Sequence, residues 1–175
     1  MLKKIKCNLN FSVFTDCDYP EATTCIKHQT KELTDIHEKF GSFPSSYTLA
    51  NTGIHQRWWD KNEVNYEEIG EQLNMDVITI SSIKQPPGNV VPWHRDTFYQ
   101  IKKRVPNRKG DPVRANIYLQ DWKLGHFIQY GNEVSTHWKQ GDGFLWNSEI
   151  LHLGANAGME TKYTLQVSGF LKNEQ

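Results

Sequence analysis

The chain has 175 residues, enough for one domain with a sizeable core, and its 20 basic and 20 acidic side chains leave no formal net charge at pH 7. A neutral chain has no overall field to attract nucleic acid or an anionic membrane surface. No stretch is apolar for long enough to span a membrane, and the basic N-terminus lacks the apolar segment of a signal peptide. We therefore expect a single domain over residues 1–175, soluble and cytoplasmic, without nucleic-acid or membrane partners.

The N-terminal part, up to about residue 75, is predicted to be helical and irregular. One or two short strands are predicted over residues 1–20, with alternating side chains over residues 10–14. A proline followed by an acidic residue, and then apolar residues at roughly helical spacing, predict a helix over residues 20–40. Residues 42–60 follow no regular pattern, and a second helix with a solvated acidic face is predicted over residues 66–73.

The rest of the chain, about residues 76–172, is predicted to be a β-rich core of short strands separated by turn signals. Many short strands at even spacing favour a sandwich or jelly roll over alternating βαβ units. The expected fold class is therefore mainly β with flanking α-helices. The strands are expected over residues 77–83, 90–96, 113–119, 127–130, 133–138, 143–146 and 163–171.

Two histidines and one aspartate form the first candidate site. Side chains alternate along an extended segment, so His94 and Asp96 project to the same face. The strand that follows the turn at Gly141 and Asp142 leads to His152, which in a jelly roll can lie beside the other two. Two imidazoles and one carboxylate on one face of an octahedral metal, with the other positions open, are the facial triad of non-haem Fe(II) oxygenases. The sequence therefore predicts a metal site at His94, Asp96 and His152.

A candidate anion site follows on the last predicted strand. Lys162 lies ten residues after His152. On this strand Lys162 and Thr164 share one face, whereas Leu165 and Val167 share the other. A cation and a hydroxyl on one inward face can bind an anion.

Further residues are candidates for the wall of a pocket. One face of the strand over residues 113–119 points either to a bound ligand or to solvent, and it carries Arg114, Asn116 and Tyr118. Trp93 and Trp146 flank the ligand strands and either wall the pocket or belong to the core. His126 and His137 lack a carboxylate in a comparable context, so we expect them at the surface or behind the ligands.

Residues 102–110 hold five of the twenty basic residues, and Pro106 and Gly110 mark the segment as a loop. Two interpretations stay open. The segment is either a solvated hairpin tip, or a loop beside the site that attracts an acidic substrate, whether small molecule or peptide.

The segments Pro87-Gly88 leading to His94-Arg95-Asp96, Gly141-Asp142, and His152 followed by Lys162 resemble the Fe(II)- and 2-oxoglutarate-dependent oxygenases. The resemblance covers about residues 77–171. The set His152, Asn156, Gly158 and Lys162 is similar to the C-terminal motif of the aspartyl/asparaginyl β-hydroxylase and free-proline hydroxylase branch. Two departures concern Lys162, where many members have arginine, and Asp96, a carboxylate that the β-hydroxylase branch often lacks.

The resemblance implies a double-stranded β-helix, which is a cupin-like jelly roll. It implies that His94, Asp96 and His152 hold Fe(II) and that Lys162 pairs with the distal carboxylate of 2-oxoglutarate, with Thr164 as a weaker hydrogen-bond candidate. The implied reaction uses O₂ and hydroxylates an amino acid or a protein side chain, with release of succinate and CO₂. Two alternatives are a non-catalytic jelly-roll binding or structural module, and a cupin-like metalloenzyme that does not use 2-oxoglutarate.

Overall fold

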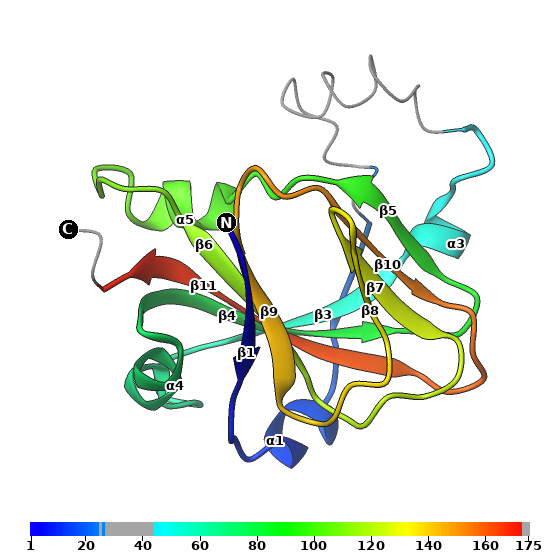
Figure 1. Ribbon diagram of the computed structural model, residues 1–175, viewed down its shortest axis with the longest axis horizontal. Coiled ribbons are helices and arrows are strands. Elements are labelled where there is room, and N and C mark those ends of the chain that lie inside the picture. The colour runs from blue at the N-terminus through cyan, green and yellow to red at the C-terminus, as the bar shows by residue number, and fades with distance from the viewer. Residues whose placement is uncertain (25, 27–43, 173–175) are drawn as a thin grey trace.

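The computed structural model describes residues 1–24, 26 and 44–172, and these form a jelly roll of two antiparallel sheets (Figure 1). The larger sheet has the strand order β1-β9-β6-β11-β4-β3-β2, and the smaller has the order β5-β10-β7-β8. In chain order the elements are β1 (Leu2–Lys6), α1 (Ser12–Thr15), β2 (Glu21–Thr23), α3 (Leu49–Thr52), β3 (Ile54–Trp59), α4 (Tyr66–Leu73), β4 (Met75–Gln85), β5 (Val90–His94), α5 (Tyr99–Arg104), β6 (Val113–Tyr118), β7 (His126–Tyr130), β8 (Glu133–Ser135), β9 (Asp142–Asn147), β10 (His152–Asn156) and β11 (Lys162–Leu171).

The central strand of the larger sheet is β11, which pairs with β4 on one side and β6 on the other. Its two faces differ as the sequence alternation predicts. Leu165 and Val167 are fully buried in the main core, which α1 and α4 also cover. Lys162 and Thr164 point the other way, into a cavity that residues of both sheets line. The larger sheet therefore has the main hydrophobic core on one face and the cavity on the other.

The pairing within the smaller sheet sets the position of two histidines. Strand β10 lies between β5 and β7. In this register His152, the first residue of β10, is opposite His94, the last residue of β5. On its other side His152 is opposite Tyr130 of β7. Backbone pairing therefore brings together two side chains that are far apart in the sequence.

A second hydrophobic cluster involves β6, β7 and β9 and is mainly aromatic. It includes Tyr118, Tyr130, Trp138, Phe144 and Trp146, all buried. The rings of Tyr130 and Trp146 are 4.9 Å apart, and Trp146 also contacts His152, with ring centroids 5.0 Å apart. These aromatic side chains support one wall of the cavity.

The predicted mainly β jelly roll is confirmed, as are the strands of the C-terminal part and the helix over residues 66–73, now α4. The side chain of Asn65 caps that helix by accepting from two backbone N–H groups, and Asn74 ends it in the left-handed conformation. The predicted strand over residues 90–96 is shorter than expected, because β5 ends at His94. Among the described residues, no helix has the length and apolar character needed to cross a membrane.

Three predictions for the N-terminal part are wrong. Residues 2–6 form β1, one of the strands expected within residues 1–20, but the alternating segment is not a strand, because residues 12–15 form α1. This helical turn places Phe14 edge-on against Trp59. Residues 21–23 form β2, because β3 supplies their backbone hydrogen bonds from far along the chain, and the rest of the predicted helix, residues 27–40, lies outside the described residues. Residues 42–60, expected to be irregular, contain α3 and β3.

The basic segment over residues 102–110 is also not entirely a loop. Its first three residues, Lys102, Lys103 and Arg104, form the last turn of α5. Positive side chains are favourable there because the carbonyl end of a helix carries partial negative charge.

Candidate metal centre and its cavity

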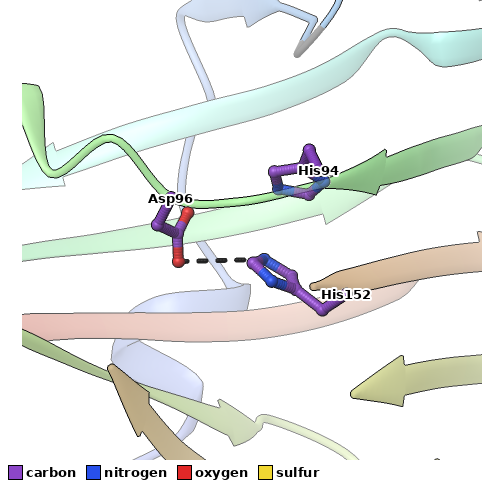
Figure 2. Close-up of side chains that lie close together, drawn as sticks. All are labelled: His94, Asp96 and His152. Carbon is purple, nitrogen blue, oxygen red and sulfur yellow. Dashed lines mark ion pairs between the residues drawn. The ribbon is translucent and has the colours of Figure 1, made fainter. Parts of the chain in front are cut away.

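The three predicted metal ligands converge. His94 ends β5, Asp96 lies two residues further on in the connecting segment, and His152 begins β10. One potential ligand atom from each residue lies within 4.8 Å of the other two (Figure 2). The structure thus brings together two imidazoles and a carboxylate, although Asp96 reaches the group from beyond the end of the strand.

Both imidazoles are oriented through their Nδ1 atoms. Nδ1 of His94 lies 2.8 Å from the carbonyl oxygen of Pro92, and Nδ1 of His152 lies 3.1 Å from that of Ile150. A carbonyl only accepts, so Nδ1 carries the proton in each ring and Nε2 keeps a lone pair for a metal. Burial lowers the pKa of His94, and burial together with the nearby His94 ring lowers the pKa of His152 to about 4. Both rings are therefore neutral at pH 7, as metal ligands must be.

Asp96 is held from two sides. Its Oδ1 accepts from Nη1 of Arg114 at 2.6 Å, and its Oδ2 accepts from Nε1 of Trp146 at 3.0 Å. Oδ2 also lies 3.7 Å from Nε2 of His152. Burial alone would raise the pKa of Asp96, but the Arg114 guanidinium and the hydrogen bond from the Trp146 N–H lower it. The carboxylate is thus ionised and fixed, with Oδ2 directed at the histidines.

Lys162 is buried in the same cavity. Its Nζ donates to the carbonyl oxygens of Ala155 at 2.9 Å and Phe127 at 3.1 Å. No carboxylate of the described chain forms an ion pair with it. Burial lowers the pKa of Lys162 to about 7. An ammonium has three donors, so one remains for a ligand.

The cavity between the sheets has a volume of about 430 Å³. Besides the three predicted metal ligands, it is lined by five of the other predicted site residues: Arg114, Asn116, Trp146, Lys162 and Thr164. Two predicted site residues are not among its walls. Tyr118 turns into the aromatic cluster, where it stacks on Trp138 and donates to Ser135, and Trp93 does not line the cavity either.

Two functional candidates were missed by sequence reasoning, Gly154 and Arg95. Gly154 leaves space beside Lys162. Ser168, expected on the same face of the last strand as Lys162 and Thr164, accepts from Nε of Arg114 at 2.9 Å. Arg95 lines the cavity, whereas strand alternation would place it on the face opposite His94. No local sequence signal marked Arg95, because the end of β5 at His94 is set by its pairing with β10.

The remaining histidines lie outside the ligand group. His137 is exposed and stacks on Trp122. His126 is buried rather than at the surface, with its Nε2 2.8 Å from the carbonyl oxygen of Glu160. Neither belongs to the cluster of potential metal ligands found among the described residues.

The comparisons with known proteins agree with this architecture. The sequence matches no protein-family model and no curated protein. Among solved structures, the viral collagen prolyl hydroxylase of Paramecium bursaria Chlorella virus-1, in complex with 2-oxoglutarate, is 14% identical with a TM-score of 0.56, over 97% of this chain and 96% of that chain. A prolyl-4-hydroxylase of Pseudomonas putida is 15% identical with a TM-score of 0.55, over 98% and 92%. The α-ketoglutarate-dependent carbocyclase SnoK of nogalamycin biosynthesis is 12% identical with a TM-score of 0.56, over 95% and 78%.

The chain has the fold of these oxygenases. At such low sequence identity the likeness extends to the fold alone.

Proposed function

We propose that the protein is an Fe(II)- and 2-oxoglutarate-dependent dioxygenase that hydroxylates an amino acid or a protein side chain. The observation that carries the proposal is the buried Lys162, which has no ion-pair partner in the described chain and shares a cavity with His94, Asp96 and His152. A buried lysine is costly unless something offsets its charge. A dianionic co-substrate would supply that offset.

The residues fit Fe(II). Two neutral imidazoles and one ionised carboxylate match the donor set of non-haem iron sites, and they leave open positions for other ligands. Hydrogen bonds from both Nδ1 atoms and to both oxygens of Asp96 orient the donors before any metal is bound. His94, Asp96 and His152 would hold the ion.

The cavity also fits 2-oxoglutarate. Lys162 would bind its distal carboxylate, with Thr164 beside it on the same face of β11. Among the described residues, three buried side-chain polar atoms have no hydrogen-bond partner, and two of them, Arg95 Nε and Asn116 Oδ1, belong to residues that line this cavity. Unpaired buried polar atoms of this kind indicate that the cavity takes a polar ligand.

When bound, iron with 2-oxoglutarate and O₂ supplies the chemistry of this class, in which oxidative decarboxylation to succinate and CO₂ is coupled to hydroxylation of a C–H bond. The chain itself holds the ligands, binds the co-substrate and excludes water. Arg114 and Trp146 fix Asp96, and the aromatic cluster closes one wall. Two of the structures with the same fold are prolyl hydroxylases, and another is α-ketoglutarate-dependent.

The first test is spectroscopic. Adding Fe(II) and 2-oxoglutarate without oxygen is expected to give a weak visible charge-transfer band, because the keto acid chelates the iron. His152→Ala should abolish the band, whereas the matched control His137→Ala, at an exposed histidine outside the ligand group, should keep it. A folded protein that binds Mn(II) but shows no band would contradict the proposal.

Two further measurements separate the alternatives. With O₂ admitted, a non-catalytic binding module produces no succinate, whereas a dioxygenase releases some even without its prime substrate. Lys162→Ala should sharply raise the 2-oxoglutarate concentration needed for turnover. A cupin-like metalloenzyme that does not use 2-oxoglutarate would be indifferent to that change.

A further inference from the structure

Arg95 supplies one of the unpaired cavity atoms noted above, and the proposed binding of 2-oxoglutarate at Lys162 gives the charge of Arg95 no partner. It lies between His94 and Asp96, just beyond the end of β5, and lines the cavity. Its Nε is buried and has no hydrogen-bond partner, and no ion pair joins Arg95 to a carboxylate of the described chain. A guanidinium stays charged at any physiological pH, so this is a cation that lacks a counter-anion.

The other cations of the cavity wall already have partners or a role. Arg114 pairs with Asp96 and donates to Ser168. Lys162 donates to two carbonyls and is assigned to the co-substrate. The acid at the cavity rim, Glu21, accepts from Nε1 of Trp58 at 3.2 Å and is exposed to solvent. With Lys162 assigned to the co-substrate, Arg95 is the remaining cation of the described cavity wall that has no counter-anion.

The guanidinium group favours one kind of ligand. Its planar fork of donors matches a carboxylate, and such charge-assisted pairs are about twice as strong as neutral hydrogen bonds. An unsatisfied buried N–H costs free energy until an acceptor arrives. An acid bound here would satisfy Nε and offset the charge in one step.

The size of the cavity restricts the ligand further. A volume of about 430 Å³ lies in the range of small-molecule sites, and the co-substrate must share it. The basic residues of α5 and the segment after it, 102–110, do not line the cavity, so they do not select the group that reaches the metal centre. Among the described residues that line the cavity, the partly buried Arg95 is then the cation available to an acidic group of the substrate.

We infer that Arg95 binds the carboxylate of a small acidic prime substrate, which adds a second carboxylate subsite to the one at Lys162. This inference rests on the proposed function, because it takes the Lys162 subsite to be filled by 2-oxoglutarate. It narrows the substrate from an amino acid or protein side chain to a free small acid, and it assigns the specificity to a residue inside the predicted ligand motif.

The test uses the full chain with Zn(II) in place of iron, saturated with 2-oxoglutarate. The probes are the twenty L-amino acids and a set of small hydroxy and keto monocarboxylic acids, each paired with its own carboxamide. Binding is detected by ligand-observed NMR and measured by calorimetry. At least one acid is expected to bind, with its carboxamide at least tenfold weaker. Arg95→Met should weaken the acid at least tenfold, and Arg95→Lys, which keeps the charge without the fork, should weaken it less.

Arg104→Met is the matched control, because Arg104 is an exposed arginine of α5 that does not line the cavity, and it should bind the acid as the wild type does. The affinity of each variant for Zn(II) reports whether His94 and Asp96 are still in place.

Three results overturn the inference: no acid binds, carboxamides bind as well as acids, or Arg95→Met weakens the binding of 2-oxoglutarate alone. If the Fe(II) charge-transfer band is absent, the proposed function fails and this inference with it. If the band is present and acid binding ignores Arg95, only the inference fails.

Discussion

Gly154 leaves the ammonium of Lys162 open to the cavity, since a Cβ at position 154 would lie 3.4 Å from Nζ. Gly154 is two residues after His152 on β10, so both positions face the same side of the strand. The glycine thus leaves space in front of a buried cation, on the same face of β10 as a predicted metal ligand.

Gly154→Val is expected to weaken 2-oxoglutarate binding at least tenfold, because its methyl groups occupy the space in front of Lys162. Gly154→Ala should have a smaller effect, since its Cβ meets Nζ at an ordinary contact distance. Calorimetry with the Zn(II) protein measures both affinities. The affinity for Zn(II) is the control and should stay within about threefold of wild type, because no ligand is altered. Unchanged 2-oxoglutarate binding by Gly154→Val would show that the co-substrate lies elsewhere.

The affinity for 2-oxoglutarate should fall as the pH rises above about 7. Burial places the pKa of free Lys162 at about 7, and a bound carboxylate raises it, so binding at pH 8 takes up a proton. The dissociation constant then rises by roughly tenfold per pH unit until the pKa of the bound state is reached. Calorimetry of the Zn(II) protein at pH 8, in buffers of different ionisation enthalpy, counts the proton.

Lys162→Arg is the control for this pH dependence, because an arginine stays charged throughout the range. His126, a titratable residue that senses the charge of Lys162, has its pKa lowered by burial and is neutral at these pH values. If the affinity for 2-oxoglutarate falls equally with pH in wild type and in Lys162→Arg, the proton taken up on binding belongs to a group other than Lys162.

Lys162→Met should stabilise the metal-free protein at pH 6, by roughly 1–4 kcal/mol, because it removes a buried charge that has no counter-ion. The pKa of Lys162 falls from 10.5 when unfolded to about 7 when folded. The unfolded wild type therefore binds more protons between these values, and wild-type stability rises with pH there. The extra stability of Lys162→Met over wild type is therefore largest below pH 7 and disappears as the pH approaches 10.5. Urea unfolding at pH 6 and at pH 9.5 measures the difference in unfolding free energy between Lys162→Met and wild type. An equal difference at the two pH values would show that the charge of Lys162 is not its cause.

The sequence predicted site residues correctly where the alternation of side chains along a strand determines which face each residue occupies. The alternation on β11 separates Lys162 and Thr164 from Leu165 and Val167, and both sets lie where that period places them. The spacing of His94 and Asp96 indicated the pair correctly even though the strand ends between them. Each of these inferences depends on neighbours two residues apart.

Features that depend on distant partners were not predictable. Residues 21–23 form a strand because β3 pairs with them, which overrides the local helix pattern. Trp146 was a candidate pocket wall, but its hydrogen bond to Asp96 joins residues fifty positions apart. Arg95 lines the cavity although alternation would place it opposite His94, because the chain leaves the strand at His94 and alternation no longer fixes the direction of the side chains that follow.

Arg114 and Trp146 should contribute unequally to holding Asp96. Arg114→Met leaves a buried carboxylate without its ion pair and is expected to cost roughly 3–5 kcal/mol of stability. Trp146→Phe keeps the ring that packs on Tyr130 and His152 but removes the N–H that donates to Oδ2. Trp146→Phe should lower the affinity for Zn(II) by about tenfold and reduce stability less than Arg114→Met does.

Urea unfolding of the metal-free protein measures the stability of each variant, and competition with a chromogenic chelator measures its affinity for Zn(II). Lys139→Met, which breaks an exposed ion pair with Asp121, is the control and should change neither. A normal Zn(II) affinity in both site variants would mean that Asp96 needs no support to reach the metal.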